Sequence, residues 1–166
     1  MMTSKAIIIT LSILFFSNLA FSQDNKSIKW YSWEEGYKIA KKENKILIVD
    51  LVTDNCPFCK KMEKSTYTNK KVVKTINESF VAVMFNPESA KNKDKTFSLN
   101  GKQLTSIQLL ACLTNNSTLS NEPKIGYPTT SFLFTKDHEV YFETGYQDAS
   151  IFKYMLKSCL KIQETK

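Results

Sequence analysis

The spacing of apolar and polar residues changes at position 46. Before it, apolar residues recur near helical spacing and predict an amphipathic helix that ends at about Asn44, with an inner face of Trp33, Tyr37, Ile39 and Ala40. Ser32 and Glu35 match a capping-box pattern, in which each residue satisfies a backbone N–H of the other. We therefore place the start of this helix in the segment Trp30 to Trp33, with Ser32 as the residue that caps it.

From position 46 onward the pattern alternates between buried strands and helices. Ile46 to Val52 is apolar on both faces except for Asp50, as expected for a central strand covered on both sides. Helices are predicted from Pro57, which suits a first helical turn, and from Asn69 to about Asn77. Phe80 to Phe85 is a second apolar strand. The order strand, helix, strand predicts a parallel unit with a right-handed crossover.

The segment from about 88 to 124 has a different character. It opens with a lysine-rich run, and residues 97–104 then alternate around Asn100-Gly101, a strong hairpin signal. Residues 106–113 predict a short helix, and 115–122 predict a polar loop. The alternative, that this segment is mostly surface loop, stays open at this point.

The last part of the chain predicts a hairpin and a helix. Strands at 131–134 and 140–142 flank the polar turn 136–139. Asp148 or Ser150 is able to cap the final helix. Its apolar face, which we expect to cover the sheet, carries Phe152, Met155, Leu156, Cys159 and Leu160.

Residues 1–22 have the layout of a secretory signal peptide. Lys5 precedes an apolar core from Ala6 to Phe16, and small residues precede the expected cleavage after Ser22. The core is short for a membrane span, although an uncleaved anchor remains an alternative. The remaining 166 − 22 = 144 residues fit one domain, 23–166. We expect export to the periplasm, with secretion as the alternative.

The formal net charge of +7 comes entirely from lysine, because the chain contains no arginine. Nucleic-acid readers depend on the bidentate contacts of arginine and cluster their positive charge. The lysines here are spread along the chain. We therefore expect no nucleic-acid partner and a monomer with a solvated lysine-rich surface.

Cys56 and Cys59 carry the clearest chemical signal. They directly follow the first predicted strand and open a helix, whose N-terminus stabilises a thiolate. Two cysteines separated by two residues also supply half of a metal site. The other candidate ligands, Cys112, Cys159 and His138, stand alone. We therefore expect a redox-active dithiol, with Cys56 as nucleophile and Cys59 as resolving thiol, and no metal and no cofactor.

Two alternatives stay open. The same dithiol is able to hold a soft metal such as Cu(I), with Met62 close in sequence, which would make the protein a binding module or a copper carrier. Cys112 and Cys159 either form a structural disulfide or remain separate buried thiols. We favour separate thiols because Cys159 falls on the apolar face of the last helix.

The order of elements and the dithiol resemble the thioredoxin superfamily, over nearly all of residues 23–166. The resemblance implies a three-layer α/β fold, with a central mixed sheet flanked by helices and an insertion at about 88–124 before the cis-proline strand. Asp50, six residues before Cys56, matches the buried acid that relays a proton. Burial should raise the pKa of its carboxyl. Pro128, preceded by Tyr127, matches the cis-proline of the family.

The resemblance also implies activity as a thiol–disulfide oxidoreductase that acts on protein thiols and disulfides. Tyr127, Pro57 and Phe58 are the expected substrate contacts. Asn55 stands where most thioredoxins have tryptophan, and Pro57-Phe58 stands where they have Gly-Pro, so the direction of electron flow is open. Because Asp50 suits reductase chemistry, we lean toward a reductase that receives electrons from a membrane donor.

Overall fold

The computed structural model describes residues 26–115 and 125–166. The expected signal peptide, residues 1–22, lies outside the described residues. Five strands form the central sheet in the order β1-β3-β2-β6-β7. They are β1 (Trp30–Tyr31), β2 (Ile46–Leu51), β3 (Phe80–Phe85), β6 (Thr129–Leu133) and β7 (Val140–Thr144). The first three of these strands run parallel, and β6 and β7 are antiparallel to their neighbours.

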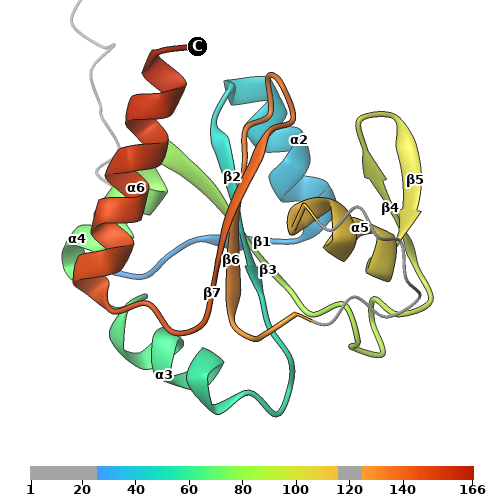
Figure 1. Cartoon of the computed structure of the whole chain (residues 1–166), viewed down its shortest axis with the longest axis horizontal. Helices are drawn as coiled ribbons and strands as arrows, with labels where there is room; N and C mark the ends of the chain where they lie inside the picture. The colour runs from blue at the N-terminus through green and yellow to red at the C-terminus, as the bar shows by residue number, and fades with distance from the viewer. Residues whose placement is uncertain (1–25, 116–124) are drawn as a thin grey trace, which may run out of the picture.

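Helices cover both faces of the sheet (Figure 1). On one side lie α4 (Lys70–Ser79) and α6 (Ala149–Glu164), and on the other lie α2 (Trp33–Glu43) and α5 (Ser106–Leu113). The alternation of side chains along β2 builds a separate core on each face, since Ile46 and Ile48 pack on the first side and Leu47, Val49 and Leu51 on the second. The expected three-layer α/β fold with a mixed sheet is confirmed.

The helix starts follow the predicted capping chemistry. Ser32 caps α2, where the Glu35 N–H donates to Ser32 Oγ over 3.3 Å and the Ser32 N–H donates to the Glu35 carboxylate over 3.4 Å. Asp148 caps α6 by accepting the N–H groups of Ser150 and Ile151. Asp148, and not Ser150, is therefore the cap of the last helix.

Trp30 and Tyr31 are a correction to the prediction. We expected them to lead into the first helix and predicted no strand there, but the two residues form β1, which pairs with Ala82 and Val83 of β3. A strand of two residues is too short to show a period of its own. Its place at the edge of the sheet depends on the pairing with β3, which the sequence does not show.

The segment after β3 contains the predicted hairpin and helix, so its described part, residues 88–115, is not mostly surface loop. Strands β4 (Thr96–Leu99) and β5 (Lys102–Thr105) form a separate two-stranded sheet beside α5. The indole N–H of Trp33 donates to the carbonyl oxygen of Ser98 over 3.1 Å and ties this hairpin to α2. The polar loop expected at 115–122 lies, apart from Asn115, outside the described residues.

Cys112 and Cys159 do not form a disulfide. Cys159 is buried, as expected from the apolar face of α6, whereas Cys112 is exposed. The prediction of two buried thiols is therefore right for Cys159 and wrong for Cys112, because α5 turns that side chain away from the core. Among the described helices, none combines the length and the hydropathy needed to cross a membrane.

Gly36 allows α2 to approach the sheet closely. A Cβ atom at this position would lie 2.3 Å from Cγ2 of Val83, which is fully buried and has no room to move. In an open helix, alanine in place of glycine stabilises by up to about 1 kcal/mol. Here we expect Gly36→Ala to lower the free energy of unfolding by about 1–3 kcal/mol, because overpacking outweighs helix propensity.

Urea denaturation measures this effect. Lys38→Ala is the matched control, since Lys38 lies exposed on the same helix, and it should change the free energy of unfolding by less than about 0.5 kcal/mol. A stabilised Gly36→Ala variant would show that the helix and sheet do not pack as described.

Candidate active site

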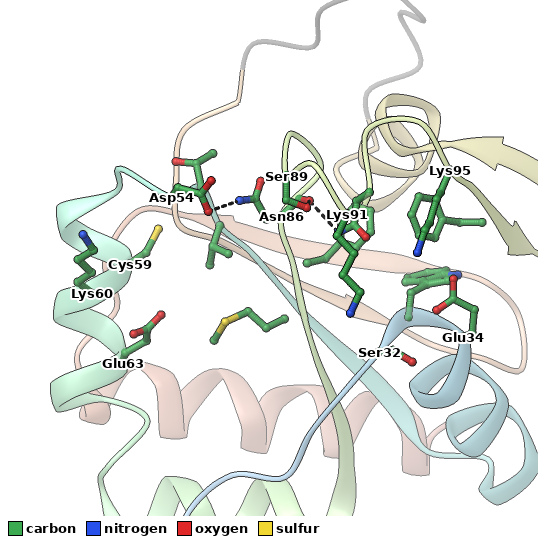
Figure 2. A pocket seen from close by; sticks show the side chains of 17 residues that line it. Ser32, Glu34, Asp54, Cys59, Lys60, Glu63, Asn86, Ser89, Lys91 and Lys95 are labelled. Atoms are coloured by element: carbon green, nitrogen blue, oxygen red, sulfur yellow. Dashed lines mark hydrogen bonds between the residues drawn. The ribbon is translucent and has the colours of Figure 1, made fainter.

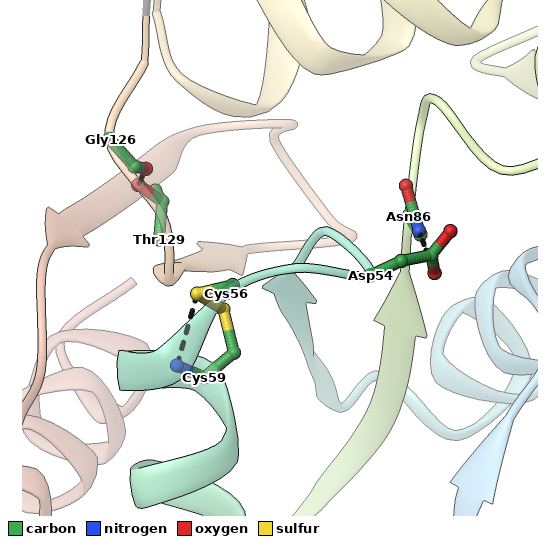
Figure 3. Close-up of a disulfide and its surroundings, with 6 residues drawn as sticks. All are labelled: Asp54, Cys56, Cys59, Asn86, Gly126 and Thr129. Atoms are coloured by element: carbon green, nitrogen blue, oxygen red, sulfur yellow. Dashed lines mark hydrogen bonds between the residues drawn. A yellow bond between two sulfur atoms is a disulfide. The ribbon is translucent and has the colours of Figure 1, made fainter.

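The two cysteines at the start of α3 (Pro57–Ser65) form a disulfide. Cys56 is the N-cap residue, and its sulfur accepts the backbone N–H of Cys59 over 3.0 Å (Figure 3). Pro57 fills the first helical position, where its missing N–H has no cost. A sulfur that receives a backbone N–H at a helix N-terminus is favoured as a thiolate when the disulfide is reduced.

The disulfide is largely shielded from solvent, with Cys56 6% and Cys59 3% exposed. It forms a small cluster with Val52, and Tyr127 packs against this cluster. Phe58, in contrast, is 58% exposed in the first turn of α3. The structure therefore brings Tyr127 to the cysteines and leaves Phe58 free to contact a partner.

The Tyr127–Pro128 peptide bond is cis. The segment around it is held in place from both sides: the Gly145 N–H donates to the carbonyl oxygen of Pro128 over 2.7 Å, and Thr129 Oγ1 donates to the carbonyl oxygen of Gly126 over 2.7 Å (Figure 3). Burial raises the pKa of Tyr127 to about 12, and the charge of Glu88 adds to this shift. Tyr127 is therefore a neutral phenol beside the disulfide at physiological pH.

Asp50 is an acid buried in the middle of the sheet, with 1% of its surface exposed. By strand alternation it shares a face with Ile48, against which Met62 of α3 packs. Burial is the main cause that raises the pKa of its carboxyl to about 7, with a further increase from the charge of Glu63, while the hydroxyls of Tyr67 and Thr130 lower it. The expected upward shift is confirmed, and a group of this pKa is able to exchange a proton near neutral pH.

Tyr67, Thr130 and Glu63 were missed by sequence reasoning. Thr130 is the register partner of Asp50 on β6, and Tyr67 lies in the turn after α3. Neither position carries a motif. The helical spacing of Glu63, four residues after Cys59, was the one available signal, because it places both side chains on the same face of α3.

A cavity of about 480 Å³ lies beside Cys59 (Figure 2). Its walls include Met84 on β3 and charged side chains of both signs: Lys60, Glu63, Lys91, Lys95, Glu34 and Asp54. Asn86 donates to Asp54 Oδ1 over 2.9 Å at the rim. Because Lys91 and Lys95 belong to the segment that precedes the hairpin, the predicted insertion contributes one wall of this cavity, on the side opposite Cys59 (Figure 2).

The methionine considered for the copper alternative, Met62, does not lie with the cysteines. Met62 is fully buried in the core between the sheet and α6, whereas the cysteines belong to a different cluster. Within residues 26–115 and 125–166, no group of three or more His, Cys, Asp or Glu residues is arranged to hold a metal ion. Among the described residues, Met84 packs against the cysteine cluster, so a soft metal would have the two thiols and this thioether as candidate ligands.

Known proteins share this architecture. A family model described as a thioredoxin-like domain matches residues 33–159. Spermatogenesis-associated protein 20 of Mus musculus is 32% identical over 71 residues, which make up 42% of this chain and 9% of that protein. The chain thus corresponds to only a small part of this curated relative.

Two solved structures show the same fold. A thioredoxin from Thermus thermophilus has a TM-score of 0.57 at 20% identity, with 81% of this chain and 88% of that chain covered. A DsbH oxidoreductase has a TM-score of 0.54 at 15% identity, with 91% and 98% covered. Together with the match over residues 33–159, the sheet order and the disulfide at the start of α3 lead to one conclusion: the chain belongs to the thioredoxin-like domain family.

Proposed function

We propose that the protein is a thiol–disulfide oxidoreductase that exchanges disulfides with protein partners in an exported compartment, in the reducing direction. The observation that carries this proposal is the Cys56–Cys59 disulfide at the N-terminus of α3, next to a buried acid whose pKa is about 7. The solved thioredoxin and the DsbH oxidoreductase, which share the fold, support it by analogy.

The chemistry begins with the reduced dithiol. The Cys56 thiolate attacks one sulfur of a partner disulfide, forms a mixed disulfide and expels the other partner sulfur as a thiolate. Asp50, as a carboxylate, takes the proton of the Cys59 thiol. The Cys59 thiolate then attacks the Cys56 sulfur, releases the partner's second thiolate and closes the Cys56–Cys59 disulfide. Two electrons pass to the partner, and the described structure corresponds to the oxidised product.

The pKa of Asp50 supports the reducing direction. At neutral pH a carboxyl with a pKa of about 7 is ionised in about half of the molecules, so a base is available for the second thiol. The exposed side chain of Phe58, in the first turn of α3, and the ring of Tyr127, which packs against the cysteines, offer apolar contacts near the disulfide. Pro57, also exposed, completes the surface that a partner would meet.

The exported location and a membrane electron donor are parts of the same proposal. They rest on the signal-peptide pattern of residues 1–22 and on the need for an electron source outside the reducing cytosol. Each reductive turnover leaves the protein as a disulfide. A donor must therefore supply two electrons to restore the dithiol.

The reduction potential tests the direction. After equilibration with glutathione buffers of defined ratio, we expect a potential near that of thioredoxin, about −270 mV. A potential near about −120 mV would mark a strong oxidant and contradict the reducing direction. For this two-electron couple 30 mV corresponds to about 1.4 kcal/mol, so the two potentials differ by several kcal/mol in the preference for the oxidised state and are easily distinguished.

A further inference from the structure

Four buried oxygen atoms beneath α3 make no hydrogen bond with any described residue. They are both carboxyl oxygens of Asp50, the phenol oxygen of Tyr67 and the hydroxyl oxygen of Thr130. The three residues are 1%, 5% and 1% exposed. Buried polar atoms are nearly always paired, and one left unpaired costs about 1–3 kcal/mol. Three unpaired groups in one place therefore call for a common explanation.

The two hydroxyls converge on the carboxyl. Thr130 lies directly opposite Asp50 in the β2–β6 register, and side chains of such pairs stand about 5 Å apart. The ring of Tyr67 is fixed edge to face against Trp30 and Phe152, with centroid distances of 5.1 and 5.5 Å. Both hydroxyls lie close enough to Asp50 to lower the pKa of its carboxyl, although neither makes a hydrogen bond of normal geometry to it in the described structure.

The chemistry of the three groups is complementary. A hydroxyl is able to donate one hydrogen bond, and a carboxylate only accepts. Tyr67 stays protonated, because burial and the charge of Asp50 raise its pKa well above the ordinary value. The turn that carries it is anchored, since Thr66 Oγ1 donates to the carbonyl oxygen of Gln147 over 2.6 Å.

We propose that Tyr67 and Thr130 form a hydroxyl cradle that donates hydrogen bonds to the Asp50 carboxylate when it ionises. The cradle sets the pH at which Asp50 ionises and becomes a base. The use of that base in catalysis rests on the proposed function. Tyr67 and Thr130 are positioning residues, because they act on the dithiol only through Asp50.

The other neighbours of Asp50 define the controls. Glu63 on α3 raises the pKa of Asp50 through its charge, opposite to the effect of the hydroxyls. Met84, the register partner on β3, is uncharged. On α6, burial raises the pKa of the Cys159 thiol to about 12, so it stays neutral. In the oxidised protein Cys56 and Cys59 do not titrate.

The test is a carbon-13 NMR titration of the Asp50 carboxyl in the oxidised full chain, with Asp50→Asn to assign the signal. We expect Tyr67→Phe and Thr130→Val each to move the midpoint up by about one pH unit, since a hydrogen bond to a charged group is worth roughly tenfold in ionisation. Glu63→Gln should move it down. The hydroxyl variants and Glu63→Gln should thus shift the midpoint in opposite directions. A general loosening of the core would let water reach Asp50 and would shift the midpoint in the same direction in every variant.

An unchanged or lowered midpoint in both hydroxyl variants would overturn the cradle. Thr130→Val keeps the shape of the side chain, so it decides the question if Tyr67→Phe does not fold. The titration needs no activity, and its failure is therefore distinct from failure of the proposed function, which would appear as an inactive wild-type protein. In an active protein, the acid limb of the pH–rate profile should move up with the midpoint in Tyr67→Phe.

Discussion

Replacing Cys56 by serine is expected to lower the rate of insulin disulfide reduction by at least about a thousandfold. The serine hydroxyl does not ionise near neutral pH and forms no disulfide, so both the attack and the electron transfer are lost. The rate is measured with dithiothreitol as electron source, by the turbidity of the released insulin chain. Removal of an attacking group commonly has an effect of at least this size.

Cys112→Ser is the matched control for this loss. Cys112 is a free thiol on an exposed residue and lines a different cavity, together with Leu104 and His138. Partial burial of its sulfur raises its pKa. The variant should therefore keep the wild-type rate. An equal loss in Cys112→Ser and Cys56→Ser would mean that the assay reports general damage or that the wrong thiol has been assigned.

Asp50→Asn is expected to stabilise the oxidised protein at pH 8 by about 4 kcal/mol. The pKa of Asp50 is about 7 in the folded chain, whereas in the unfolded chain it takes the ordinary value of 3.8. The difference is about three pH units, and each unit corresponds to about 1.36 kcal/mol. Above pH 7 the folded protein must hold a buried carboxylate. Asparagine removes that charge and keeps the shape of the side chain.

The pH dependence makes this prediction specific. Between about pH 4 and 7 Asp50 holds a proton in the folded state that it has lost in the unfolded state, so its contribution to stability falls as pH rises through this range. Below about pH 4 both states are protonated, and the advantage of Asp50→Asn should disappear. Urea denaturation at pH 4 and pH 8 measures both ends. A gain of equal size at the two pH values would contradict the buried charge as its cause.

The periodicity of the sequence was sufficient for the elements with strong apolar patterns. Strands β2 and β3 are apolar runs, broken only by Asp50 in β2, and α2 and α6 each carry a cap and one apolar face, so local chemistry alone placed them. The Asn100-Gly101 turn was equally local, because both residues adopt positive φ there. Strand β1 was not predictable, since its two residues are ordered by a strand that lies about 50 residues further along the chain.

The residues of the candidate site also fall into those that the sequence could associate and those that only the fold brings together. Cys56, Cys59 and Asp50 stand within ten positions of each other, and their spacing was sufficient to associate them. Thr130 reaches Asp50 only through the register of β2 against β6, across 130 − 50 = 80 residues. Tyr67 reaches it only because the turn after α3 packs under the sheet. Contacts of this kind depend on tertiary structure and leave no periodic signal in the sequence.

Trapping of partners with Cys59→Ser gives the clearest decision on the proposed function. In this variant Cys56 is still able to attack, but nothing resolves the mixed disulfide, which should accumulate. Mass spectrometry after exposure to disulfide-containing protein is expected to show adducts linked through Cys56, and Cys56→Ser treated in parallel should show few or none. Adducts that form only in Cys56→Ser would reverse the roles of the two cysteines, and their absence from both variants would contradict disulfide exchange at this site.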